Sequence, residues 1–193
     1  MQIATIFLFM FISPILGLTD EERSEIVNNH NNYRANVQPA AADMLSMSWH
    51  PDAEKSAQLW ASQCKKLVHD NSENMNDGKY GHCGQNIFVS SGQLPWSTAV
   101  KAWYSEVSKF KYGSSRNNFA EIGHYTQVVW AQSHKVGCGY AQCRDSTGYF
   151  HNYVCNYCPA GNVVGKINTP YKAGAKCSAC PNSCLSNGLC AQK

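Results

Sequence analysis

Residues 123–130 read GHYTQVVW, residues 136–140 read VGCGY and residues 153–162 read YVCNYCPAGN. The first stretch predicts a short helical segment around residues 125–131. The other two lie in strands predicted at about residues 135–144 and 149–158, joined by the turn-forming sequence Asp145-Ser146-Thr147-Gly148. The sequence therefore predicts a short helix followed by an antiparallel hairpin.

Helical patterns precede this hairpin. Thr19-Asp20-Glu21-Glu22 has the form of a capping box, and side chains at helical spacing follow it until Pro39: Ile26, His30, Tyr33 and Val37. A second helix is predicted at residues 51–67, with an inward stripe of Ala53, Ala57, Trp60, Cys64 and Leu67. A third begins at Pro95, with Val100, Trp103, Tyr104 and Val107 on one face. Residues 86–89 resemble a strand, and residues 70–82 and 113–120 are predicted loops. Helices with a small hairpin indicate an α+β layered domain.

Length and composition restrict the function classes. The chain has 193 residues, of which 44% are apolar and 15% are charged, so it can bury a core and is not a disordered chain. Its formal net charge of +3 is well below the basic excess of a nucleic-acid-binding domain. We therefore expect no nucleic-acid partner.

The N-terminus indicates export. Residues 3–18, IATIFLFMFISPILGL, are almost entirely apolar and are followed by acidic residues. A spanning helix needs about 20 such residues, so the run fits a secretory signal peptide, residues 1–17, better than a membrane anchor. No Lys or Arg precedes it, and a buried first helix is the alternative interpretation. We expect a secreted, extracellular protein that starts near Leu18 and does not span a membrane.

Ten cysteines agree with export, because an even number in a secreted chain indicates disulfides. The count alone leaves many hundreds of pairings open. Cys155-x-x-Cys158 and Cys177-x-x-Cys180 look like zinc pairs. Their separation, and the oxidising compartment, make a zinc site built from cysteines the weaker alternative.

The composition changes after about Val164. Residues 165–193 hold four cysteines and few large apolar side chains, so this tail cannot bury a core of its own. Two disulfides among Cys177, Cys180, Cys184 and Cys190 would have to hold it. We expect residues 165–175 to open and to be cut by proteases before the core.

The three opening stretches, together with His30-Asn31-x-x-Arg34 and Cys83-Gly84-Gln85-Asn86, resemble the CAP superfamily of cysteine-rich secretory, antigen 5 and pathogenesis-related 1 proteins. The resemblance covers nearly the whole mature chain and implies an α-β-α sandwich over residues 18–164. The tail resembles the hinge of cysteine-rich secretory proteins, at residues 165–193. That subfamily normally continues into a six-cysteine domain linked to ion-channel block, which this sequence lacks, so the chain resembles the truncated members, among them an amphibian egg-jelly sperm attractant.

The resemblance also implies a disulfide pairing. In the core it would be Cys64–Cys143, Cys83–Cys158 and Cys138–Cys155. In the hinge it would be Cys177–Cys184 and Cys180–Cys190. Each bridge would contribute about 2–4 kcal/mol to stability.

The family carries a cleft with two His and two Glu, proposed to bind a divalent metal. By resemblance the cleft residues here are His69, His124 and Glu106, with Gln85 in the place of the second Glu. Glutamine is neutral and cannot act as a general base, but two neutral imidazoles can still bind zinc. We therefore expect weak zinc binding at His69 and His124 and no obligatory cofactor; the alternative is a pair of metal-free, hydrogen-bonded histidines. His82 is a weaker candidate than His69, and His30 is expected to pack or hydrogen-bond within the first helix.

Three function classes remain. A hydrolase is the least favoured, because no Gly-x-Ser-x-Gly or His-Glu-x-x-His motif is present and the cysteines are assigned to disulfides. We expect no enzymatic activity. A sterol- or lipid-binding module in defence or secretion is the second class, since CAP domains are associated with such cavities. The first is an extracellular signal for a cell-surface receptor, with sperm as the target cell and egg-jelly chemoattraction as the role implied by the resemblance.

Overall fold

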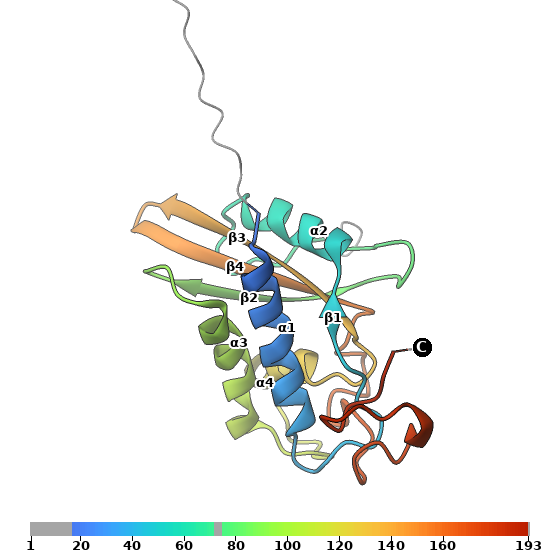
Figure 1. Cartoon of the computed structure of the whole chain (residues 1–193). Coiled ribbons are helices and arrows are strands. Elements are labelled where there is room, and N and C mark those ends of the chain that lie inside the picture. Colours follow the sequence, from blue (N-terminus) through green and yellow to red (C-terminus); the bar gives the residue numbers. More distant parts are fainter. Residues whose placement is uncertain (1–16, 72–74, 193) are drawn as a thin grey trace, which may run out of the picture.

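The computed structural model describes residues 17–71 and 75–192. The predicted signal peptide, residues 1–17, lies outside the described residues except for Gly17. Figure 1 shows three layers: α2 (Pro51–Ala61) covers one face of a sheet, and α1 (Asp20–Ala35), α3 (Trp96–Ser105) and α4 (Phe119–Val128) cover the other. This is the α-β-α sandwich that the family resemblance implies, and it confirms the α+β layered domain predicted from the residues.

The sheet is mixed. Its strands are β1 (Ser48–Trp49), β2 (Gly84–Ser90), β3 (Lys135–Asp145) and β4 (Gly148–Cys158), in the spatial order β1-β3-β4-β2. Strand β1 pairs parallel with β3, and the other pairs are antiparallel. The predicted hairpin is therefore confirmed as the centre of the sheet. Because side chains alternate between faces, Tyr153, Cys155 and Tyr157 of β4 enter the core beneath α1, while Val154 packs under α2.

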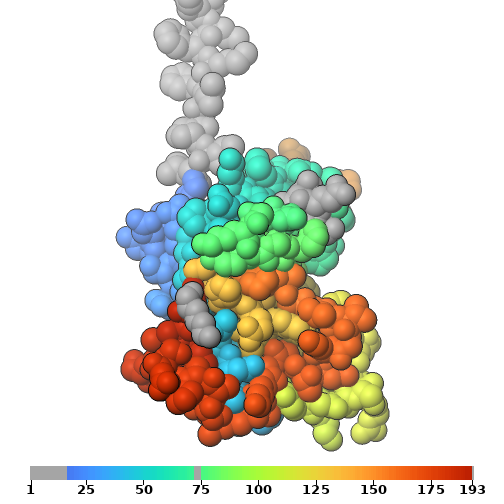
Figure 2. All heavy atoms as spheres, turned by 90° about the vertical axis from the view of Figure 1, so that its right-hand side faces the viewer, coloured from blue at the N-terminus to red at the C-terminus, as the bar shows by residue number. Residues whose placement is uncertain are grey.

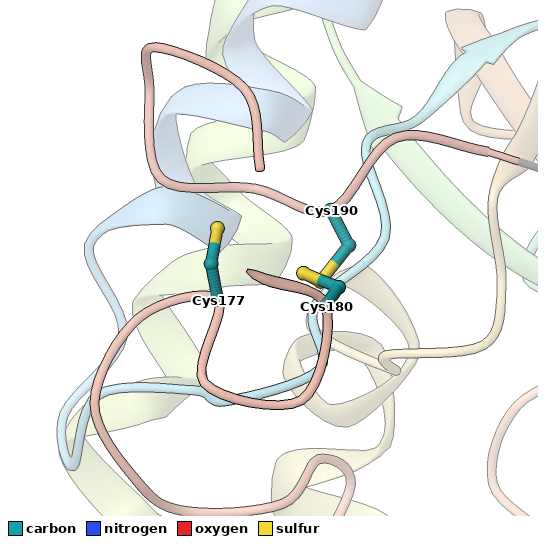
Figure 3. A group of neighbouring side chains, drawn as sticks. All are labelled: Cys177, Cys180 and Cys190. Atoms are coloured by element: carbon teal, nitrogen blue, oxygen red, sulfur yellow. A yellow bond between two sulfur atoms is a disulfide. The ribbon is translucent and has the colours of Figure 1, made fainter. Parts of the chain in front are cut away.

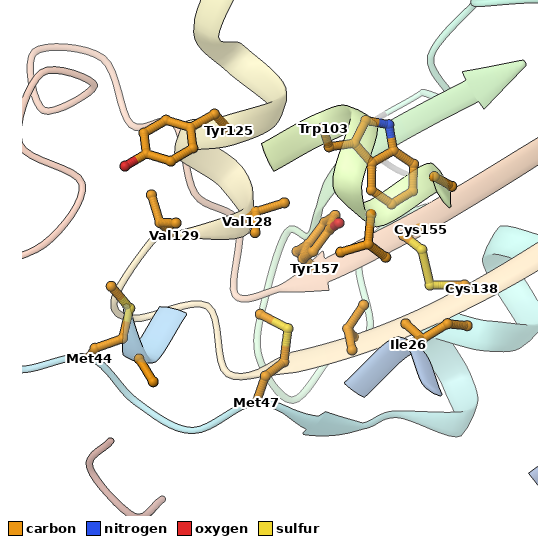
Figure 4. Packing of buried hydrophobic residues seen from close by; sticks show 14 of the residues in the cluster. Ile26, Met44, Met47, Trp103, Tyr125, Val128, Val129, Cys138, Cys155 and Tyr157 are labelled. Carbon is orange, nitrogen blue, oxygen red and sulfur yellow. A yellow bond between two sulfur atoms is a disulfide. The ribbon is translucent and has the colours of Figure 1, made fainter. Parts of the chain in front are cut away.

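The first helix begins as predicted. Thr19 Oγ1 accepts from Glu22 N (3.2 Å), and Thr19 N donates to Glu22 Oε2 (2.8 Å), which completes the capping box. Ile26 and His30 are fully buried on the helix. In Figure 4, Ile26 lies in the same cluster as Met47, Trp103 and Tyr157, which come from elements far apart in sequence.

Helix α2 lies unusually close to β3. A Cβ on Gly137 would lie 2.5 Å from the carbonyl oxygen of His50, and one on Gly139 would lie 2.7 Å from the carbonyl carbon of Ala57. Two glycines at alternate positions therefore make the flat surface on which the α2 backbone rests.

The predicted end of α2 at residue 67 is wrong. The helix ends at Ala61, and Cys64 and Leu67 adopt left-handed backbone angles, with φ of 56° and 55°. Leu67 is 64% exposed and does not continue the inward stripe, whereas Ala53, Ala57 and Trp60 do. The bridge from Cys64 to Cys143 ties the chain to the hairpin at this point.

The predicted bounds of the helical segment at residues 125–131 are also wrong. Helix α4 starts at Phe119, because the Asn118 side chain accepts from Ala120 N and caps the N-terminus. It ends at Val128, so Trp130 lies beyond it. A 3-10 helix, η1 (Glu106–Lys109), follows α3 directly and packs against α4.

Five disulfides join all ten cysteines, in the pairs that the family resemblance implies. They are Cys64–Cys143, Cys83–Cys158, Cys138–Cys155, Cys177–Cys184 and Cys180–Cys190. The first three connect elements of the sandwich and the last two lie within the tail. A second 3-10 helix, η2 (Pro181–Ser183), lies in the tail between bridged cysteines.

The tail shares the core of the sandwich. Tyr171 is 3% exposed and Leu189 is fully buried, both in the cluster that contains Ile26. Backbone hydrogen bonds of 2.8 Å run from Cys190 N to Met44 O and from Ser46 N to Cys190 O. Figure 2 shows the red tail seated against the cyan segment near residue 40. The amino-acid composition changes after Val164, but residues on both sides of this position pack into the same core.

Candidate functional site

A cavity of about 170 Å³ lies between α4, β2 and the loop that follows α2. Its lining residues are His69, Gln85, Asn86, Phe119, Ala120, Gly123, His124 and Asn162. The structure therefore brings His69, His124 and Gln85 together, as the resemblance implies. His82 does not line this cavity. Glu106 is not among the lining residues and instead contacts His124 from η1.

His124 and Glu106 form a short hydrogen-bonded pair at this site. The Nδ1 atom of His124 lies 2.6 Å from Glu106 Oε1, and Tyr125 N donates to Glu106 Oε2 (3.0 Å). The His124 side chain is 37% exposed and that of Glu106 is 21% exposed. A carboxylate accepts a hydrogen bond from Nδ1–H, so in the neutral ring this contact selects the tautomer with its lone pair on Nε2.

His69 is oriented in the same way by an amide. Its Nδ1 lies 3.0 Å from Gln85 Oε1, which also accepts from Asp70 N (3.1 Å). The backbone N–H of Asp70 can only donate, so it identifies the atom facing it as the amide oxygen. Gln85 Nε2 donates to Asn156 Oδ1 (3.0 Å), which agrees with that orientation. Gln85 therefore keeps the acceptor that a Glu would offer but brings no negative charge.

A buried hydrogen-bonded chain connects this cavity to α1. Asn86 Nδ2 donates to His124 O (3.1 Å) and to the Tyr157 hydroxyl (3.3 Å). The Tyr157 hydroxyl lies 2.9 Å from His30 Nε2, while His30 Nδ1 lies 2.8 Å from Ile26 O. Burial lowers the pKa of His30 to about 4, so the ring is neutral and bonded at both nitrogens. His30 packs and hydrogen-bonds within the fold, as predicted.

The donor set suits a weakly held metal ion. His69 and His124 each have Nδ1 occupied, so Nε2 of each is the atom that could bind zinc, a nitrogen ligand that this metal accepts. Glu106 and Gln85 would act behind the ligands by holding the two rings. Among the described residues, this pair belongs to no group of three or more metal-binding side chains. Two ligands from the protein are fewer than the three or four of tight zinc sites.

Two other clusters of metal-binding residue types exist in the described part of the chain, and disulfides account for their cysteines. Cys177, Cys180 and Cys190 lie together, but Figure 3 shows Cys180 bonded to Cys190, and Cys177 is bonded to Cys184. In the second cluster, Cys158 is bonded to Cys83, which leaves His50 Nε2 at 2.6 Å from Asp77 Oδ2.

Sequence reasoning missed two residues that shape the site. Asn162, in a left-handed conformation with φ of 53°, donates to Gly123 O (2.8 Å) and accepts from Thr126 Oγ1 (2.6 Å), which holds the segment between β4 and the tail against α4. Arg34 is 1% exposed and donates to the backbone oxygens that surround the end of α4. These acceptors are Leu45, Val128, Trp130 and Ala131, at 2.7–3.1 Å. Both residues lie in motifs that carry the family resemblance, and these motifs are the sequence signal that could have identified them.

The fold and the cleft define a disulfide-stabilised α-β-α sandwich with a paired-histidine cavity. The family model described as "Cysteine-rich secretory protein family" (CAP) matches residues 27–157, and the chain belongs to this family. It is 47% identical over 177 residues to cysteine-rich secretory protein 3 of Equus caballus, covering 91% of this chain and 71% of that protein. It is 44% identical over 179 residues to cysteine-rich secretory protein 2 of Cavia porcellus, covering 92% and 72%.

Solved structures agree with the fold. A structure described as NaASP2 with Zn2+ is 31% identical and has a TM-score of 0.75, with 92% of this chain and 98% of that chain covered. Na-ASP-1 is 28% identical with a TM-score of 0.76, covering 98% of this chain and 52% of that chain.

Family membership and five disulfides indicate an extracellular protein. Within the described residues, no helix has both the length and the apolar character that crossing a membrane requires.

Proposed function

We propose that this protein is a secreted ligand for a receptor on the sperm surface and that it directs sperm movement as an egg-coat attractant. Its relatives at 47% and 44% identity are cysteine-rich secretory proteins. The resemblance of its motifs to the cysteine-rich secretory proteins, a group that includes an egg-jelly sperm attractant, supports sperm as the target cell. The five disulfides support a rigid extracellular ligand that presents a fixed surface.

The composition of the cavity carries the choice of binding over catalysis. Covalent hydrolysis needs a hydroxyl or thiol within hydrogen-bond reach of its base. None of the residues that line the described cavity is Ser, Thr or Cys, so neither imidazole has such a nucleophile beside it there. Gln85 cannot act as a general base. This arrangement favours a ligand that binds a receptor over an enzyme that acts on a substrate.

Zinc in this proposal is a weak and non-obligatory ligand. His69 and His124 would hold it, and Glu106 and Gln85 would orient the two rings. A related structure is described with Zn2+, which supports zinc as a ligand for a protein of this fold. A bound ion would add positive charge at the mouth of the cavity, next to the exposed Phe119 side chain.

Fluorescently labelled, oxidised protein beginning at Leu18 provides the test. We expect saturable binding to sperm that unlabelled protein displaces, and directed swimming up a gradient of the protein in a two-chamber assay. Reduced and alkylated protein is the matched control, because it has the same sequence without the disulfides. Non-saturable binding, equal binding to somatic cells or undirected swimming would refute the proposal. Extraction of lipid or sterol from vesicles by the same preparation would favour the lipid-binding class instead.

A further inference from the structure

The sulfur atoms of the two tail disulfides lie close together. The Sγ atoms of Cys177, Cys180 and Cys190 all lie within 4.8 Å of one another, although Cys177 is bonded to Cys184 and Cys180 is bonded to Cys190. Figure 3 shows Cys177 beside the Cys180–Cys190 bridge. A disulfide changes partner when a thiolate attacks one of its sulfur atoms. If the bond from Cys177 to Cys184 opened, the thiolate of Cys177 would therefore lie next to a second disulfide.

Cys184 is the point at which a thiol in solution can reach these bridges. It is the one exposed residue among the ten cysteines, all of which lie in the described part of the chain. Its partner Cys177 is 5% exposed, and Cys190 of the neighbouring bridge is 3% exposed. Because access helps to decide which disulfide sulfur is attacked, an external thiolate would attack the sulfur of Cys184 and release Cys177.

The backbone already holds Cys177 and Cys180 at a distance that a disulfide can span. A hydrogen bond of 2.9 Å from Cys180 N to Cys177 O closes the turn at residues 177–180. The first and fourth Cα atoms of such a turn lie less than about 7 Å apart, and disulfides usually join Cα atoms about 4.4–6.8 Å apart. Cys177 has a left-handed φ of 59°, a conformation that costs free energy and persists only where its surroundings hold it. Opening the bond to Cys184 removes one of these constraints.

Cys184 and Cys190 also face each other across the backbone. They form an isolated antiparallel bridge, and hydrogen bonds of 2.8 and 2.7 Å join the residues on either side of them. Because these hydrogen bonds flank the two cysteines, the pair is of the non-hydrogen-bonded kind, in which the Cα atoms lie about 4.5 Å apart. This separation also falls within the range that a disulfide spans. The same backbone therefore fits two different pairings of the four cysteines.

We propose that the tail is a site of thiol–disulfide exchange, at which an external thiol converts the pairs Cys177–Cys184 and Cys180–Cys190 into Cys177–Cys180 and Cys184–Cys190. The external thiolate bonds to the sulfur of Cys184, and Cys177 leaves as a thiolate. The Cys177 thiolate bonds to the sulfur of Cys180 and displaces the Cys190 thiolate. The Cys190 thiolate then bonds to the sulfur of Cys184 and displaces the external thiolate. The thiol is regenerated, and no cysteine is oxidised or reduced overall.

The exchange is confined to the tail and gives the protein two tail forms of the same composition. Every cysteine of the three sandwich bridges is buried or half-buried. The segment between Cys184 and Cys190 carries the exposed Leu185 and the fully buried Leu189. New bonds at both ends of this segment would change how it lies against Met44, whose carbonyl oxygen accepts from Cys190 N. The concentration of thiol around the protein would set how fast the two forms interconvert.

Disulfide mapping of the wild-type protein tests the proposal. The oxidised protein from Leu18 is incubated with reduced glutathione at about pH 8, where a fraction of the thiol is ionised, and is then quenched with acid and cut with trypsin. In the tryptic peptide 177–193, both bridges of the structure cross the bonds between residues 180 and 184, whereas neither bridge of the exchanged form does. Backbone cleavage there in the mass spectrometer should therefore split the peptide only after glutathione treatment. The Cys138–Cys155 bridge should stay unchanged as the internal control. An unchanged tail, or open tail cysteines without the new pairs, would overturn the proposal.

Removing the outer bridge tests whether Cys177 carries the exchange inward. The double variant Cys177→Ser with Cys184→Ser keeps the Cys180–Cys190 bridge but has no tail thiolate to attack it. Under conditions that exchange the wild type, this bridge should stay intact, whereas Ser186→Ala, at an exposed position of the tail, should exchange as the wild type does. Loss of the bridge in the folded double variant would show that glutathione reaches it directly and would overturn the relay through Cys177. The melting temperature shows whether the double variant is folded, and the wild-type map decides the exchange without it.

Discussion

Adding one methyl group at Gly139 is expected to destabilise the protein strongly. The new Cβ would lie 2.7 Å from the carbonyl carbon of Ala57 and closer still to the backbone of Gln58. Ordinary carbon contacts are about 3.5–4.0 Å, so α2 would have to move by about 1 Å. The helix resists this movement, because Gln58 Nε2 donates to Tyr140 O (2.8 Å), Tyr140 N donates to Gln58 Oε1 (3.1 Å) and Cys64 is bridged to Cys143.

Overpacking of this kind costs about 1–3 kcal/mol, and contact between two backbones favours the upper value. For a chain of this size each kcal/mol lowers the melting temperature by about 2–4 °C, so Gly139→Ala should melt about 6–12 °C below wild type. Circular dichroism of the oxidised proteins is the assay. Gly92→Ala is the matched control, because its Cβ would meet nothing within 4 Å. Equal melting temperatures for the two variants would refute the close-packing argument.

Three further predictions concern the site, the core and the tail. Calorimetry should show weak zinc binding that weakens at acid pH. The binding should be lost in His124→Ala and strengthened in Gln85→Glu, which restores a carboxylate; wild-type affinity of His124→Ala would exclude the site. The free energy of unfolding should fall by up to about 3 kcal/mol as the pH drops from about 6.5 to about 4, because the unfolded chain protonates His30 in this range and the folded chain does not. If the unfolding free energy of His30→Gln depended on pH as that of wild type does, this explanation would be wrong. Limited proteolysis should cut first near Val164, which is 95% exposed, and Tyr171→Ala should accelerate release of the tail. First cuts within residues 20–160 would show instead that the sandwich opens to proteases more readily than the tail.

The sequence predicted those parts of the fold that depend on local signals. The Thr19 capping box and the turn at residues 145–148 depend on neighbouring residues only, and the structure confirms both elements. The end of α2 was mispredicted because the helical pattern continues to Leu67, while the bridge at Cys64 is set by the distant Cys143. No local pattern indicates which segment will rest on Gly137 and Gly139.

The candidate site was likewise predicted only in part from the sequence. Family motifs located His69, His124, Gln85 and Glu106, and composition alone would not have assembled them. The role of Gln85 becomes clear only from the structure, because the backbone N–H of Asp70 shows which end of the Gln85 amide faces His69. Residue type predicted the lost charge but not the retained hydrogen-bond acceptor.

Leu18 and Leu189 belong to one cluster of buried side chains, which has a consequence for biosynthesis. Folding during synthesis generally starts with the N-terminal part of a chain. Here the side chain of Leu189 leaves the ribosome long after that of Leu18, and closing so long a loop costs entropy before the packing is gained. The sandwich must therefore wait, with part of its apolar surface uncovered, until the tail arrives. Chaperones of the secretory pathway would have to protect the nascent chain during that interval.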